Sequence, residues 1–179
     1  MAGEGAPAGS MSFQMAHGNR RAKGLTESGT ARGLLAKGEP PFYVTAFAEG
    51  HTMKPIPLGA KGSFTLLVQP EHLANRFKDA TLPPVLATPV MIMVMENAAL
   101  NAIKAYLDPG ESALGTAVDI RHLAATPVGR QVTGEAEVTK VDGRRIAFAV
   151  RATEGSKEIG VGSHSRAVID AARFAQRLG

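Results

Sequence analysis

The sequence predicts an α+β fold, in which an antiparallel sheet wraps around one long central helix. A long apolar segment at residues 89–107 has helical periodicity, and after Ser112 the period changes from 3.6 to 2. Turn signals at Asp142-Gly143 and at residues 154–156 separate the strands that follow. A sheet with one apolar face must cover it, and this helix is the one sizeable element available to do so.

The elements follow in a simple order. Residues 62–70 predict a first strand, and Thr88-Pro89 favours a helix start, because threonine can cap free amide groups and proline suits the first turn. The helix should be buried on most sides, since its apolar belt is wide. Four strands then form a meander over residues 114–124, 129–141, 144–154 and 157–169. Such a sheet would leave an edge exposed, so we expect a homodimer.

The amino-terminal part is different in composition. Residues 1 to about 40 are rich in Gly, Ala, Ser and Arg and have no sustained period. We expect residues 1–55 to be a flexible or poorly packed extension, and residues 56–179 to form one domain. The basic residues of the extension would suit a targeting peptide, but its glutamates are atypical of one.

Composition limits the possible functions. The chain has no cysteine, which excludes disulfides, thiol nucleophiles and thiolate metal sites. It shows no metal-ligand spacing, no apolar run that could cross a membrane and no signal-like segment, so the expected location is cytoplasmic. The net charge of +4 and the pI near 9.6 suit a small molecule that carries phosphates. The basic residues are scattered, which disfavours nucleic acid as a partner.

Glu96 is the first candidate for chemistry, because it lies in the apolar run MIMVMENAAL on the apolar side of the predicted helix. A carboxylate in such a place takes up a proton, finds a partner or does chemistry. The structural alternative is a glutamate paired with a core cation or one that reaches solvent.

Two further residues gain weight together with Glu96. His122 shares the apolar face of its strand with Val118 and Ile120, and alone it would be read as a core histidine. If its strand packs across the amino-terminal half of the helix, His122 and Glu96 could meet near Thr88. By contrast, His164 and Arg166 are expected on the polar outer face of the last strand. Candidates there and nearby for contacts with the phosphate groups of a small molecule are Arg144, Arg145, Lys157 and Arg166.

Residues 82–168 resemble the hot-dog-fold thioesterases, and most closely the fluoroacetyl-CoA thioesterase branch. The resemblance rests on residues 87–132, on VDGRRIAFAVRATEG and on IGVGSHSRAVI. That branch uses a Thr, a Glu eight residues later, a His twenty-six residues after the Glu, and a Gly near the substrate carbonyl. The corresponding residues are Thr88, Glu96, His122 and Gly115. The branch also has phenylalanines in a lid before the Thr, whereas KDATLPPVLAT has no aromatic residue.

The resemblance implies a hot-dog fold and an acyl-CoA thioesterase that acts as a homodimer without metal or redox cofactor. Glu96 would be a general base or a nucleophile, and the acyl group stays open. The alternative is a noncatalytic module of the same fold that binds acyl-CoA or an acyl carrier. A hydratase is a weaker alternative, because its signature segment is missing.

Overall fold

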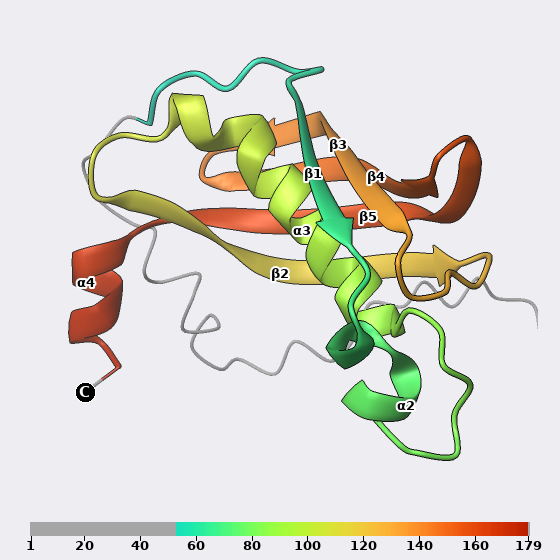
Figure 1. Ribbon diagram of the computed structural model, residues 1–179. Helices are drawn as coiled ribbons and strands as arrows, with labels where there is room; N and C mark the ends of the chain where they lie inside the picture. The colour runs from blue at the N-terminus through green and yellow to red at the C-terminus, as the bar shows by residue number, and fades with distance from the viewer. Residues whose placement is uncertain (1–52, 179) are drawn as a thin grey trace, which may run out of the picture. The chain divides into compact units, whose positions relative to one another are not determined.

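The computed structural model describes residues 53–178, and Figure 1 shows the arrangement of its elements. The predicted extension over residues 1–55 falls outside this range, apart from its last three residues. The elements are β1 (Lys61–Leu67), a 3-10 helix (Pro70–His72), α2 (Ala74–Phe77), α3 (Thr88–Ile103), a 3-10 turn (Lys104–Tyr106), β2 (Glu111–His122), β3 (Gln131–Asp142), β4 (Arg145–Glu154), β5 (Lys157–Asp170) and α4 (Ala171–Gln176).

The five strands form one antiparallel sheet in the order β1-β3-β4-β5-β2. The sheet curves around α3, which packs mainly on β1 and β3 (Figure 1). The turns between β3 and β4 and between β4 and β5 contain Gly143 and Gly155, at φ angles of 57° and 59° that suit glycine. The predicted architecture of an antiparallel sheet around a central helix is confirmed.

Two glycines let the sheet approach the helix. A Cβ atom at Gly62 of β1 would lie 2.2 Å from the backbone nitrogen of Ala102, and one at Gly134 of β3 would lie 2.7 Å from the carbonyl oxygen of Val94. These contacts are with main-chain atoms of α3, which cannot rotate away. The seating of α3 on the sheet therefore depends on these two positions having no side chain.

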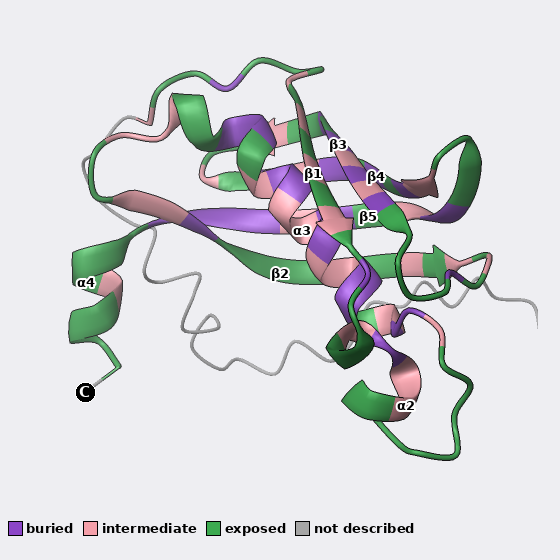
Figure 2. Cartoon of the chain, in the orientation of Figure 1, coloured by how far each residue is buried: buried purple, intermediate pink, exposed green. Residues whose placement is uncertain are grey.

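The helix is less enclosed than its composition predicts (Figure 2). One side is buried against the sheet, but the other side is only half-buried in the single chain, as is the inner face of β2. β2 is an edge strand whose outer edge has no partner among the described residues. The buried residues of α3 are Val90, Met91, Val94, Met95, Ala98, Ala99, Ala102 and Ile103. Its half-buried residues are Thr88, Ile92, Met93, Glu96, Asn97 and Leu100.

Candidate active site

The start of α3 joins Thr88 to His122. Ala87 is the N-cap of the helix and forms no side-chain cap bond, while Thr88 and Pro89 are its first two residues. The expectation that Thr88 caps the helix is therefore wrong. Its hydroxyl Oγ1 lies 3.0 Å from Nδ1 of His122 at the end of β2, so the side chain links the start of the helix to this strand.

His122 has the properties of a proton acceptor. Burial lowers its pKa, against a smaller opposing contribution from the backbone at Ala124, so the imidazole is neutral near pH 7. Its Nε2 is buried and forms no hydrogen bond with a side chain or backbone group of the described residues. A neutral imidazole held through Nδ1 with a second nitrogen unused suits proton transfer.

Glu96 lies more than two helical turns further along α3, against Gly115 of β2. A Cβ atom at Gly115 would approach Oε1 of Glu96 to 2.6 Å and Cε1 of His164 to 3.2 Å. The glutamate side chain remains 36% exposed in the single chain. The prediction that Glu96 faces inward therefore agrees with the structure, although the carboxylate is not sealed from solvent.

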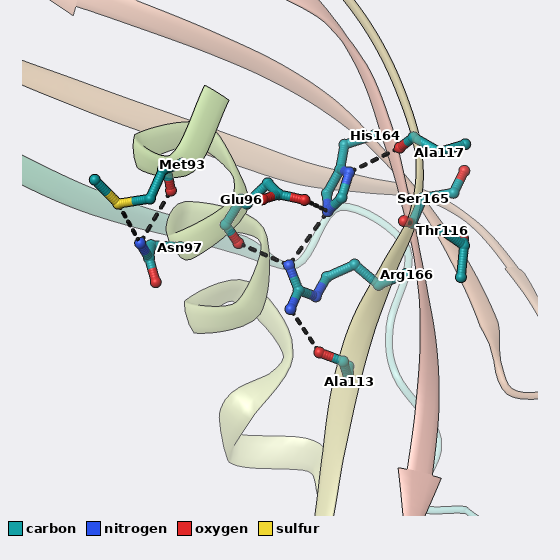
Figure 3. A network of polar contacts seen from close by, with 9 residues as sticks. All are labelled: Met93, Glu96, Asn97, Ala113, Thr116, Ala117, His164, Ser165 and Arg166. Atoms are coloured by element: carbon teal, nitrogen blue, oxygen red, sulfur yellow. Dashed lines mark hydrogen bonds and ion pairs between the residues drawn. The ribbon is translucent and has the colours of Figure 1, made fainter. Parts of the chain in front are cut away.

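The nearest imidazole to Glu96 is His164, not the predicted His122. Oε1 of Glu96 lies 3.7 Å from Nε2 of His164, whose side chain is 1% exposed (Figure 3). NH1 of Arg166 donates to the backbone carbonyl of Glu96 at 3.1 Å and lies 3.3 Å from Nε2 of His164. NH2 of Arg166 donates to the carbonyl of Ala113 on β2 at 2.5 Å. One guanidinium thus connects α3, β2 and β5.

The expected outward direction of His164 and Arg166 is wrong, because a β-bulge reverses the faces of β5. At the turn, Glu154 pairs with Lys157 and Thr153 with Glu158, but beyond the bulge Ala152 pairs with Gly160. This shift by one residue places His164 opposite the buried Phe148 and Arg166 opposite the buried Ile146. Arg166 is therefore not a surface contact for phosphate.

Arg144 is also engaged within the fold, since its guanidinium pairs with Glu111 at low exposure and donates to the carbonyl of Val168. Arg145 is exposed, whereas Lys157, likewise exposed, donates to the carbonyl of Ala125. Of the four predicted phosphate contacts, these last two keep side chains at the surface.

The proposed reactive residues form two separate pairs in one chain. Thr88 and Glu96 are eight residues apart on the helix, which is about 12 Å along its axis. On β2, Gly115 and His122 are separated by roughly 20 Å of extended strand. The structure therefore brings together Thr88 with His122, and Glu96 with Gly115, but does not join the two pairs within one protomer.

Comparison with known proteins identifies the family to which the chain belongs. Residues 68–172 match the model of the fluoroacetyl-CoA-specific thioesterase family. The chain belongs to this family. Over 95 residues it is 48% identical to the fluoroacetyl-CoA thioesterase of Streptantibioticus cattleyicolor, which covers 53% of this chain and 68% of that protein.

Solved structures agree. The fluoroacetyl-CoA thioesterase FlK superposes with a TM-score of 0.66 and 38% identity, over 69% of this chain and 96% of FlK. A hot-dog-like protein from Thermanaerovibrio acidaminovorans has the same fold at 20% identity, with a TM-score of 0.62 over 69% of this chain and 90% of that protein. The predicted hot-dog fold and the predicted acyl-CoA thioesterase are confirmed.

Two further properties concern only residues 53–178. Over that range no helix has the length and apolar character needed to span a bilayer. Nor does that range contain a group of three or more His, Cys, Asp or Glu side chains placed to hold a metal ion.

Proposed function

We propose that this thioesterase hydrolyses small acyl-CoA esters at a site shared between two protomers of a homodimer. One protomer would contribute Thr88 and His122, and its partner would contribute Glu96 and Gly115. The observation that carries this proposal is the separation of the two pairs within one chain, each of which is well formed by itself.

Symmetry of the edge strand supports the shared site. If β2 of one protomer pairs antiparallel with the same strand of a second copy, a two-fold axis crosses the strand. An axis at Asp119 would set Gly115 of one copy opposite His122 of the other, because the bulge between Gly115 and Ala117 removes one residue from the count. The dimer would then contain two equivalent sites, and each site would combine one pair of residues from either protomer.

The uncovered apolar surface supports a second copy as the occupant of this edge. Val118 is 44% exposed, although it lies on the same face of the sheet as the buried His164 that it pairs with. Half-buried Ile92, Met93 and Leu100 continue this surface along α3. Burial of such a surface favours association.

The chemistry follows from the groups present. Glu96 as a general base would take a proton from water, which attacks the thioester carbonyl, and the C–S bond then breaks to release the acid and CoA. As a nucleophile, Glu96 would instead form an anhydride that water hydrolyses. The backbone at Gly115 and the amide of Thr88 are candidates for binding the oxyanion, because Pro89 has no N–H and the next two amides of α3 donate to the carbonyl of Ala87. Thr88 and His122 would orient the substrate and carry a proton to the leaving thiolate.

The acyl group is proposed to be small. The relatives named above are fluoroacetyl-CoA thioesterases, and a variant of FlK has been solved in complex with acetyl-CoA. Residues 78–88 contain no aromatic side chain, and Leu82, which is 36% exposed, is the large apolar residue nearest the middle of this segment. Without an aromatic lid we expect weaker discrimination between fluoroacetyl and acetyl groups. A cytoplasmic location stays a prediction.

Mixed dimers test the shared site. Glu96→Gln and His122→Ala are expected to be inactive homodimers toward a panel of short, branched and halogenated acyl-CoAs. After unfolding and refolding together, the mixture should regain about a quarter of wild-type activity, because half of the dimers contain one intact site. If each protomer held a complete site, the mixture would stay inactive. Binding of CoA esters by the wild type without any hydrolysis would instead favour the noncatalytic module.

A further inference from the structure

We propose that His164 is a positioning residue for Glu96, and that Arg166 fixes the tautomer through which it acts. This inference rests on the proposed catalytic role of Glu96 and extends it to a second imidazole. The residues that carry it are His164, Arg166 and Glu96, which meet on the inner face of the sheet beside Gly115 (Figure 3).

The surroundings of His164 hold its ring in one orientation. Nδ1 lies 2.9 Å from the carbonyl oxygen of Ala117 on β2, and the ring stacks on Phe148 of β4 at a centroid distance of 6.1 Å. The side chain is 1% exposed, so no solvent-driven rearrangement competes with these contacts. The titratable and charged groups against it are Glu96 from α3 and Arg166 from β5.

The hydrogen-bond partners determine which nitrogen carries the proton. A carbonyl oxygen only accepts, so Nδ1 of His164 must donate to Ala117. A guanidinium only donates, so Nε2 must accept from NH1 of Arg166. The ring is therefore neutral, with its lone pair on Nε2. Burial, the largest effect, also lowers the pKa of His164; the hydrogen bond to Ala117 and the charge of Glu96 oppose it, and Arg166 lowers the pKa further.

His164 and Arg166 give the partly exposed side chain of Glu96 neighbours whose positions are fixed. Nε2 and the guanidinium beside it define one edge of the space that the carboxylate occupies, and the missing side chain at Gly115, next to both the carboxylate and the His164 ring, leaves room for it on β2. Arg166 also holds the main chain of Glu96 through its carbonyl. Both the backbone position of Glu96 and the direction of its carboxylate are thus set by His164 and Arg166, which act through Glu96. Such control of direction matters because misplacement by about 1 Å can reduce turnover by up to about 100-fold.

Two substitutions separate the two ends of the ring. His164→Asn keeps an amide near the position of Nδ1 and removes the group at Nε2, whereas His164→Gln can place an amide near Nε2. We expect His164→Asn to lower kcat by about 10- to 100-fold with little change in KM, and His164→Gln to recover part of this loss. Val150→Ala is the matched control, because it removes buried apolar atoms from the same face of β4, opposite Gly162, but none of the contacts that orient His164; it should lower Tm and leave kcat near that of the wild type.

A merely structural role would give the opposite pattern. If folded His164→Asn retains the wild-type kcat, or if Gln and Asn lose activity equally in proportion to Tm, the positioning role is overturned. Full activity of Glu96→Gln would overturn both this role and the catalytic role of Glu96, whereas its inactivity beside an unaffected His164→Asn would overturn the positioning role alone.

A second measurement uses no substitution at His164. Nitrogen-15 NMR of the wild-type imidazoles should show protonated Nδ1 and unprotonated Nε2 for His164, and the Nε2 signal should shift in Glu96→Gln. An Nε2–H tautomer, or an Nε2 signal unchanged by Glu96→Gln, would contradict the proposal.

Discussion

Gly115 and Glu96 touch across the space between β2 and α3, so that any side chain at position 115 would meet the carboxylate. This contact predicts the effect of Gly115→Ala. The new Cβ would come within 2.6 Å of Oε1, and the end of the Glu96 side chain can move to relieve the clash. We expect the variant to fold with a small loss of Tm but to lose about 10-fold or more in kcat. Thr116→Ala, at the exposed neighbouring position, is the control and should retain activity in the same assay.

Thr88→Ala should affect catalysis more than stability. Because Thr88 is not the N-cap, its removal should not cost the roughly 1 kcal/mol that loss of a cap does. It does remove the hydroxyl that holds His122. We expect kcat/KM to fall about 10-fold or more, Thr88→Ser to restore most of it, and the urea midpoint to change little. A large loss of stability in Thr88→Ala would restore the capping interpretation.

Val118→Asp should dissociate the proposed dimer and remove activity. A charge on the uncovered inner face of β2 would have to be buried against the second copy. Size-exclusion chromatography with light scattering should show a monomer that does not hydrolyse acyl-CoA. Val128→Asp is a matched control outside the strands, since Val128 is 48% exposed and Val118 is 44% exposed. An active monomeric Val118→Asp enzyme would contradict the shared site.

Stability should fall on the acid side of neutrality. Burial lowers the pKa values of His164 and His122 in the folded protein, while histidine in an unfolded chain titrates at about 6.5. Below that pH the unfolded chain binds more protons. The stability from these two neutral rings is thus fully present above about pH 6.5 and is lost as the pH falls through this value toward the lower folded pKa values. Urea midpoints measured between about pH 7.5 and about pH 5 should decrease less steeply in His164→Gln than in the wild type. Equal slopes would exclude His164 as a source of this dependence.

Gly62→Ala should destabilise the whole domain. Its Cβ would lie 2.2 Å from a backbone nitrogen and 2.4 Å from a backbone oxygen of α3, so relief requires the helix to move away from β1. We expect a loss of about 3 kcal/mol or more in the free energy of unfolding, the upper part of the range for overpacking. Ser63→Ala should be nearly neutral by urea titration, because Asn101 bonds to the backbone carbonyl of Ser63 and not to its side chain. A Gly62→Ala protein as stable as Ser63→Ala would show that the helix can be displaced at little cost.

Local patterns in the sequence were sufficient to predict the sheet, the central helix and the inward direction of Glu96. The helical period placed Glu96 beside apolar neighbours, and the alternation in β2 placed His122 on the face that meets Thr88. The predicted four-strand meander is wrong for its first strand. Only β3, β4 and β5 follow one another in the sheet, while β2 pairs with β5 at one edge and β1 pairs with β3 at the other.

The pairing of Glu96 with His164 was not predictable from alternation, because it depends on the bulge in β5. A two-residue turn extended without interruption would pair Phe148 with Ser163 and leave His164 outside. The extra residue, Ile159, moves the register by one and exchanges the two faces. No local turn signal in the sequence marks it. The available clue would have been that polar groups on the inner face need hydrogen-bond partners such as His164 and Arg166. This need is apparent only when the position of α3 is known.

Arg166 makes the strand and the helix mechanically dependent on each other. The same guanidinium donates to the carbonyl oxygen of Ala113 on β2 and to that of Glu96 on α3. Even a small displacement of the strand would therefore move the backbone of Glu96. A molecule that binds beneath β2 and displaces this strand would therefore inhibit the enzyme without entering the space where the ester is cleaved.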